Sequence, residues 1–167
     1  MQVAGFCHHA KALAKGRVRP DGRVRHAARG DEASLARLRH ALWPEESEVE
    51  HRVEIERFLN DLNRRGAVLV AEGESELLGF AEVSILAYAE GCRTDRVGYL
   101  EGWFVEPAAR QRGIGRRLVA AAEAWARSLG CVEFASDAEE QNQPSAAAHR
   151  ALGFAEVGLI RCFRKDL

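Results

Sequence analysis

The sequence predicts a single α/β domain, a mixed sheet with helices on both faces, and three observations lead to this fold class. The chain has 167 residues, and one domain usually contains about 100–200. Apolar residues make up 47% of the chain and charged residues 29%, which argues against a disordered chain or a membrane barrel. Strand and helix patterns alternate in the order β-α-α-β-β-β-α-β-α-β, and strands that follow helices favour a mixed sheet.

Residues 23–28 alternate weakly and predict the first strand. The next helix begins at Asp31, a good capping residue, and ends before Pro44, because the residue before a proline avoids helical geometry. Its apolar face carries Leu35, Leu38 and Leu42. A second helix ends near Gly66, and its apolar residues are Val49, Val53, Ile55, Phe58, Leu59 and Leu62.

Two apolar runs that flank the polar turn 73–76 predict a hairpin over residues 67–86. The polar, glycine-containing stretch 90–97 predicts a loop, and residues 98–105 predict a further strand. That strand ends at Glu106-Pro107 and leads into a glycine-bearing turn.

The last third of the chain predicts two helices and two strands. A long helix over 116–129 has its apolar residues on one face and ends at Gly130. Residues 131–136 predict a strand, 145–152 a helix, and 154–163 a final strand with a basic end.

Charge is distributed unevenly along the chain. Residues 1–30 carry seven basic residues and one acidic residue, a net charge of +6, whereas the rest of the chain carries −7. An acidic body favours cationic partners. We expect residues 1–22 to be a basic, inert and disordered leader, with nucleic-acid binding as its alternative role, and residues 23–167 to be the folded domain.

The remaining composition indicates a cytoplasmic protein without a structural metal or disulfide framework. The longest apolar runs are far shorter than a membrane-spanning helix, and the leader lacks the apolar stretch of a signal peptide. No CxxC pattern occurs, so we expect reduced thiols. The four cysteines are Cys7, Cys92, Cys131 and Cys162.

The most informative segment is Arg-Gln-Arg-Gly-Ile-Gly-Arg-Arg-Leu over residues 110–118. It joins a predicted strand to a helix whose first backbone N–H groups are free to bind phosphate. Gly113 and Gly115 let the backbone approach an anion, and Arg112 and Arg116 add positive charge. The P-loop and dinucleotide-binding patterns are absent. Taken alone, the segment fits a pyrophosphate cradle and a tight turn with surface arginines equally well.

The pattern Arg-x-x-Gly-x-Gly after a strand that ends in Val-x-Pro resembles the acetyl-CoA signature of the GNAT acetyltransferases. The resemblance covers about residues 23–164 and implies the GNAT fold, a central mixed, mostly antiparallel twisted sheet with helices on both faces. It also implies acetyl-CoA as co-substrate and no metal. The cofactor-binding residues that it implies are Trp103, Phe104, Val105, Gln111, Arg112, Gly113, Ile114, Gly115, Arg116 and Asn142.

Four further segments are similar to one family within that superfamily, the aminoglycoside 6'-N-acetyltransferases, which acetylate an amine of these antibiotics and confer resistance. They are Leu-Trp-Pro at 42–44, Tyr-Leu-Glu-Gly-Trp-Phe-Val at 99–105, Glu-Phe-Ala-Ser-Asp at 133–137 and His-Arg-Ala-Leu-Gly-Phe at 149–154. The resemblance implies an aminoglycoside as substrate and a homodimer, with the C-terminal strand near the interface. It implies no nucleic acid and no membrane as partner.

Two acids are the expected catalytic and substrate-binding residues. Glu101 lies within an apolar strand, where a buried or half-buried acid is uncommon unless paired, and Asp137 ends a strand. A protonated amine needs carboxylates that attract it and accept its proton. The alternatives are a sheet-edge glutamate paired with an arginine and a turn or capping aspartate.

The resemblance adds three candidates. His149 takes the place of a superfamily tyrosine and is a candidate acid for the CoA thiolate, unless it is only a hydrogen-bonded helix histidine. Trp43 and Tyr88 match aromatic positions that line the aminoglycoside pocket, and Trp43 alternatively packs in the core.

Aminoglycoside acetyltransfer has two alternatives. One is acetylation of another amine, in a polyamine, protein or peptide, on the same scaffold. The other is a non-catalytic acyl-CoA-binding or DNA-associated regulator that uses the basic leader.

Overall fold

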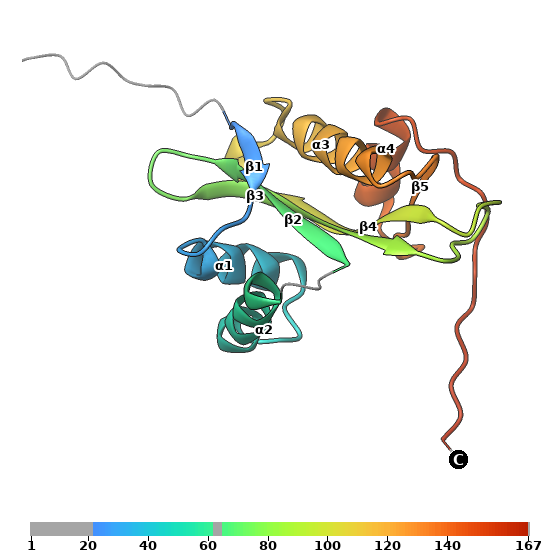
Figure 1. The fold of residues 1–167 in the computed structure, drawn as a ribbon, viewed down its shortest axis with the longest axis horizontal. Coiled ribbons are helices and arrows are strands. Elements are labelled where there is room, and N and C mark those ends of the chain that lie inside the picture. The colour runs from blue at the N-terminus through green and yellow to red at the C-terminus, as the bar shows by residue number, and fades with distance from the viewer. Residues whose placement is uncertain (1–21, 62–64, 167) are drawn as a thin grey trace, which may run out of the picture.

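The computed structural model describes residues 22–61 and 65–166, so the predicted leader lies, except for Gly22, outside the described residues. Figure 1 shows a central sheet between two layers of helices. The strands are β1 Val24–His26, β2 Gly66–Glu72, β3 Leu77–Leu86, β4 Val97–Val105 and β5 Glu133–Ser136. The helices are α1 Glu32–Leu42, α2 Glu48–Asn60, the short 3-10 helix η1 Pro107–Ala109, α3 Ile114–Ser128 and α4 Gln143–Ala151.

The sheet is mixed and mostly antiparallel, as predicted. Its order is β1-β2-β3-β4-β5; the first four strands pair antiparallel, and β4 and β5 pair parallel. Helices α1 and α2 cover one face, and α3 and α4 cover the other (Figure 1). Within the described residues no helix is long and apolar enough to cross a membrane.

Each face of the sheet has its own apolar core. On one face Leu118 and Ala122 of α3 pack, fully buried, against Leu100 of β4. On the other face Leu35 and Leu38 of α1 pack against strand residues that include Phe80. Removal of this apolar surface from water is the main contribution to the stability of the fold.

Helix α2 differs from its predicted pattern. A capping box between Ser47 and Glu50 fixes its start. Val49 and Val53, which were expected on its apolar face, are exposed, whereas Ile55 and His51 are buried. The buried face of α2 therefore carries Ile55 and a histidine, which apolar periodicity alone does not detect.

The predicted final strand over residues 154–163 is wrong for this chain. After α4, Phe154 packs against Phe134 with ring centroids 5.9 Å apart, and the following residues form no strand among the described residues. Their side chains are exposed, and the tail runs away from the body (Figure 1). The exposed apolar residues of this tail are Val157, Leu159, Ile160 and Phe163. A strand needs a neighbouring strand, and the tail lies beside none in the described chain.

Candidate active site

The predicted pyrophosphate cradle is a left-handed turn that opens α3. Gly113 is the N-cap with φ 75°, a conformation that favours glycine. Gln111, two residues earlier, also has a positive φ of 59°. Ile114 is buried and anchors the turn. The first N–H groups of this 15-residue helix are therefore presented by a fixed turn, the arrangement that binds phosphate.

Gly115 has a packing role, and its approach to an anion remains a prediction. A Cβ placed there would meet the indole of Trp103 at 2.6 Å, so this glycine allows α3 to pack closely on β4. A Cβ at Gly113 would have its nearest neighbour, Arg117, at 3.4 Å. Gly113 is thus required by its dihedral angle, and Gly115 by the contact with Trp103.

Arginines surround this turn, and several of them are held by backbone carbonyls. Arg110 Nε donates to the carbonyl of Val105 at 2.9 Å, and its guanidinium lies 5.6 Å from the centre of the Phe104 ring. Arg116 donates to the carbonyl of Ala151 at the end of α4. These contacts concentrate positive charge around the cradle.

Strand β4 extends beyond its parallel partner. The last pair that joins β4 to β5 is Leu100 with Ser136, whereas β4 continues to Val105 and there pairs with β3. The β5-facing edge of residues 101–105 is therefore left open by β5. An extended amide chain can add to such an edge through backbone hydrogen bonds. Trp103, Phe104 and Val105, which the family resemblance implies as contacts of the pantetheine arm, are on this edge.

His149 lies at the fork where β4 and β5 stop pairing. It is part of a series of hydrogen bonds. Its Nδ1 is 2.8 Å from the carbonyl oxygen of Ser145, and its Nε2 is 3.0 Å from the hydroxyl of Ser136. Ser136 in turn donates to the carbonyl of Leu100 at 3.0 Å. The imidazole also packs edge-on against Trp103, with ring centroids 6.0 Å apart.

A serine hydroxyl carries one hydrogen, so a Ser136 that donates to Leu100 can only accept from Nε2 of His149. Nδ1 can then donate to the carbonyl of Ser145 or accept from the Ser145 hydroxyl, which is 3.3 Å away. If Nδ1 alone carries the hydrogen, Ser136 instead turns its own hydrogen toward Nε2. Ser136 was missed as a site residue, because no local pattern links it to His149.

Asn142 caps α4. Its side-chain oxygen accepts from the backbone N–H of Ser145 at 3.1 Å. This is the ordinary function of an asparagine at a helix start. Contact with the pantetheine arm remains a prediction for this residue.

Glu101 lies in a β-bulge of β4. The register shifts between Glu82 and Val83 of β3, so that Glu101 has no residue opposite it. Its side chain is exposed, not half-buried as expected, and it accepts a hydrogen bond from the hydroxyl of Ser84. The expected arginine partner of the alternative interpretation is not among its hydrogen bonds or ion pairs in the described chain. The carboxylate therefore faces solvent from the sheet itself.

A hollow of about 370 Å³ lies between α1, α2 and the sheet, and Glu101 is on its wall. Glu82 lies there too, and burial raises the pKa of its carboxyl while the charge of Arg39 lowers it. Arg39 reaches Glu82 at 3.3 Å and Glu54 at 3.1 Å. Glu82 and Ser84 were missed by sequence reasoning, although they alternate with buried residues on the hairpin and so face the same side as each other.

Asp137 directly follows β5 and accepts a hydrogen bond from the phenol of Tyr99 at 2.8 Å. Burial, the bond to Asp137 and the charges of Asp137 and Glu101 all raise the pKa of Tyr99 well above its usual range. Tyr99 therefore contacts Asp137 directly, whereas Glu101 acts on the phenol through its charge and is hydrogen-bonded to Ser84. Tyr99 was missed as a site residue, although it stands two residues before Glu101 on the same strand face.

The two candidate aromatic residues lie in different surroundings. Trp43 is half-buried, with its ring edge-on to Phe80 at 6.0 Å. It also covers Gly102, where a Cβ would lie 2.4 Å from the indole. Trp43 therefore packs in the core and also flanks Glu101 through its neighbour Gly102. Tyr88 is 66% exposed, and its contact with substrate remains a prediction.

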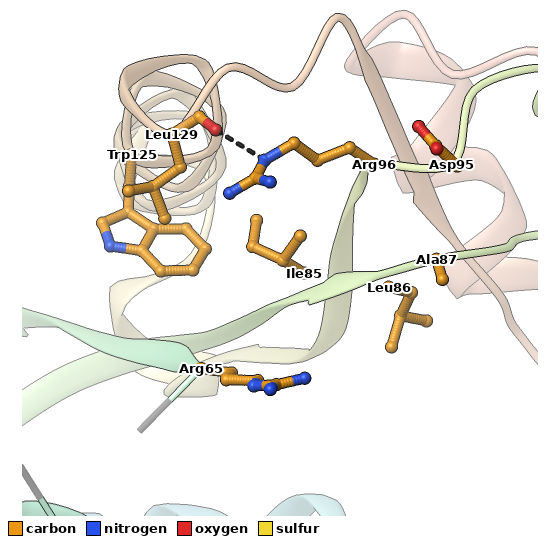
Figure 2. A pocket seen from close by; sticks show the side chains of 8 residues that line it. All are labelled: Arg65, Ile85, Leu86, Ala87, Asp95, Arg96, Trp125 and Leu129. Carbon is orange, nitrogen blue, oxygen red and sulfur yellow. Dashed lines mark hydrogen bonds between the residues drawn. The ribbon is translucent and has the colours of Figure 1, made fainter. Parts of the chain in front are cut away.

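A second hollow, of about 470 Å³, lies at the far end of α3 and contains none of the predicted site residues. Figure 2 shows three of its lining residues together: Arg96 donates to the carbonyl of Leu129, and Trp125 lies beside them. The glycine turn is at the opposite end of the same helix. This hollow is therefore separate from the cradle.

Comparison with known proteins agrees with this geometry. The model of the acetyltransferase (GNAT) family matches residues 35–154. Aminoglycoside N(6')-acetyltransferase type 1 of Klebsiella aerogenes is 50% identical over 146 residues, 86% of this chain and 96% of that protein. The protein of the same name from Stenotrophomonas maltophilia is 40% identical over 86% of this chain and 93% of its own length.

Solved structures give the same result. An apo aminoglycoside 6'-N-acetyltransferase from Acinetobacter haemolyticus superposes with a TM-score of 0.81 at 35% identity, over 87% of this chain and 99% of that one. Another, in complex with a bisubstrate analogue that joins CoA to acetylneamine, has a TM-score of 0.80 at 34% identity, over 87% and 98% of the two chains. The chain belongs to the acetyltransferase (GNAT) family and, within it, to the aminoglycoside N(6')-acetyltransferases.

Proposed function

We propose that this chain transfers the acetyl group of acetyl-CoA to the 6'-amine of an aminoglycoside antibiotic and thereby confers resistance. The observation that carries the proposal is the arrangement around β4. A left-handed glycine turn and an open strand edge lie on one side, and the carboxylates of Glu101 and Asp137 lie on the other. These features support an anion-binding cradle and a cation-binding surface at the same strand.

In this proposal the residues 111–116 hold the pyrophosphate of acetyl-CoA through backbone N–H groups and arginine charge. The pantetheine arm lies along Trp103, Phe104 and Val105, and Asn142 contacts it. The backbone N–H groups near Phe104 and Val105 stabilise the oxyanion that develops on the acetyl carbonyl. The thioester is thereby held at the fork between β4 and β5.

Glu101 and Asp137 bind the polycationic drug, with Trp43 and Tyr88 as aromatic walls. The reacting amine arrives protonated, and a carboxylate accepts that proton directly or through water. The free amine then forms a C–N bond with the acetyl carbon, and the C–S bond breaks. The thiolate leaves with the bonding electron pair, and the new amide nitrogen loses its second proton to solvent.

His149 supplies a proton to the departing thiolate. When Nε2 carries a hydrogen, His149 donates it to Ser136, which donates to the carbonyl of Leu100 at the last pair of β4 and β5. Since carboxylates take the amine proton and backbone N–H groups carry the oxyanion, we infer that the transfer step requires no metal ion.

A thiol-release assay tests the substrate class. The full chain is given acetyl-CoA with kanamycin or tobramycin, and in parallel with spermidine and with a peptide. Turnover is expected with the drugs, and the product should carry the acetyl group on the 6'-amine. Turnover of spermidine or the peptide alone would overturn the proposal in favour of another amine, and acetyl-CoA binding without any turnover would favour a regulator.

We also propose that the chain forms a homodimer through its C-terminal tail. Four large apolar side chains of residues 157–163 are 64–92% exposed, and β5 has a neighbour only in β4 among the described strands. A free strand edge and an apolar extended segment are complementary. Light scattering should give about twice the chain mass of 18.5 kDa. Leu159→Asp with Ile160→Asp should give a monomer, whereas Lys165→Glu should not; monomeric wild type contradicts this proposal.

The free thiols and the described residues also support a proposal for cellular location and domain boundaries. The described cysteines, Cys92, Cys131 and Cys162, are free thiols, which is consistent with a cytoplasmic enzyme that draws on acetyl-CoA. We propose that residues 23–167 form the acetyltransferase domain and residues 1–22 a basic leader. Deletion of the leader is expected to leave drug turnover unchanged in the thiol-release assay.

A further inference from the structure

Three metal-ligating side chains meet where α1 joins α2, and one of them, Glu54, also lines the hollow that contains Glu101. They are Glu46 from the connection and His51 and Glu54 from α2. One ligand atom from each lies within 4.8 Å of the other two. The spacing of three residues puts His51 and Glu54 on one face of the helix.

His51 is the unusual member of this group. The residue is 1% exposed, and its Nε2 is 3.0 Å from the carbonyl oxygen of Trp43. A carbonyl only accepts, so Nε2 carries the hydrogen and the neutral ring presents a lone pair on Nδ1. Nδ1 is buried and has no hydrogen-bond partner. Metal-binding histidines are usually oriented in this way, by an N–H bond from the other ring nitrogen to a carbonyl.

The two carboxylates are close to that lone pair and open to solvent. Glu46 Oε2 lies 3.4 Å from Nδ1, and the Glu46 side chain is 50% exposed. Glu54 is 48% exposed and uses Oε2 for its ion pair with Arg39, which leaves Oε1 for another partner. An ion can therefore enter from solvent on the carboxylate side.

We propose that Glu46, His51 and Glu54 bind a divalent transition-metal ion of the zinc class. One imidazole nitrogen and two carboxylate oxygens, with water in the fourth position, are a ligand set that zinc accepts. Both carboxylates supply negative charge for the ion, and Glu54 shares its charge with Arg39. A proton competes with the metal ion for the lone pair on Nδ1. With that proton bound, His51 is an ion-pair partner of Glu46 and cannot bind a metal.

A bound ion would join the α1–α2 connection to the first turns of α2. His51 holds the carbonyl of Trp43, whose indole covers Gly102 beside Glu101. The ion would thereby stiffen the segment that carries Trp43. The expected measurable result is a higher unfolding temperature with metal, because the folded state alone assembles the three ligands.

Calorimetric titration of the full chain with zinc chloride tests the site. The proteins are wild type, Glu46→Gln and the matched control Glu45→Gln, an exposed neighbour outside the cluster. Loss of a residue that hydrogen-bonds a metal ligand lowers metal affinity roughly 10–100-fold. Loss of a ligand itself, as in Glu46→Gln, should lower zinc affinity by at least as much. Other histidines and thiols also bind zinc, but they are the same in all three proteins, so the difference isolates this site.

Thermal unfolding of the same three proteins provides the second measurement. Zinc should raise the unfolding temperature of wild type and Glu45→Gln more than that of Glu46→Gln. Equal zinc affinity in all three proteins, or an equal thermal response, overturns the proposal. His51→Gln serves as a further variant, and its fold is checked by circular dichroism since His51 is buried.

Discussion

The two sides of β4 are built by different means. On the α3 side, the candidate cofactor site consists of backbone features: a left-handed glycine turn, the start of a helix and a strand edge that outruns β5. On the α1 and α2 side, the candidate substrate site consists of side chains from several elements, with Glu101 on a bulge, Asp137 after β5 and Trp43 after α1.

This difference follows from what each side has to bind. A diphosphate and an amide chain are recognised by backbone N–H and C=O groups, which any sequence can supply once the turn and the edge are formed. A polycationic drug is recognised by charges, and these must be placed individually on rigid elements. Mutations on the two sides should therefore differ in which substrate they affect.

The largest effect is expected from Gly113→Val. The side chain is strained at φ 75° and intrudes where the diphosphate would lie. Loss of two charge-assisted N–H bonds of about 1.5 kcal/mol each would weaken acetyl-CoA binding about 100-fold. The matched control is Gly130→Val, at φ 85° beyond the other end of α3, where a Cβ would have no described atom within 4 Å apart from its chain neighbours. Calorimetry should show a loss in the first variant alone; equal losses in both would mean that the turn has only a folding role.

Glu101→Gln and Asp137→Asn should affect the other substrate. Each removes one negative charge next to Tyr99, and loss of a charged hydrogen bond of about 1.5–3 kcal/mol lowers kcat/KM for the drug about 10–100-fold. Acetyl-CoA affinity should stay close to that of wild type. Glu74→Gln, in the exposed hairpin turn, is the control. Wild-type turnover in both variants would remove these acids from the proposed mechanism.

Ser136→Ala and His149→Gln test the hydrogen-bonded chain at the fork. If the two residues deliver one proton together, each variant should lower kcat about tenfold, and the double variant should be no slower than either single one. Steady-state kinetics with a saturating drug measures this. Multiplied losses in the double variant would show that the residues act independently.

The smallest effect is expected from Tyr99→Phe, about threefold in KM for the drug, since the phenol supports Asp137 with one hydrogen bond. Burial and Asp137 raise the pKa of the phenol above its usual 10, so the protonated phenol stabilises the fold fully below pH 10. That contribution is lost as the pH rises through the raised pKa. Urea unfolding of both proteins should show a wild-type advantage that shrinks above pH 10; a constant difference would contradict the assignment.

Local features were predictable because they depend on residues close together in the chain. The hairpin over 67–86 follows from two apolar runs around a polar turn, and β2 and β3 confirm it. The helix from Asp31 to Trp43 follows from its leucine spacing and from Pro44, and α1 confirms it. The glycine turn is the case that matters most for function, since one left-handed residue and a helix start are sufficient to form it.

Three expectations failed because they depend on distant partners. Glu101 is exposed because a bulge opposite Glu82 and Val83 turns it out of the sheet, and register is a property of two strands. Val49 and Val53 are exposed because the buried face of α2 is the one that carries His51 and Ile55. Residues 154–163 were predicted as a strand but lie beside no strand in the described chain.

The sequence by itself determined the order of the elements as far as α4, the mixed sheet and the glycine turn before α3, because periodicity, proline and glycine act through the local backbone. Only the tertiary structure decided that Asp137 meets Tyr99, that Ser136 links His149 to Leu100, and that His51 is buried against Trp43. Each of these contacts joins separate elements, and their distance depends on strand register and helix packing, which no local pattern encodes.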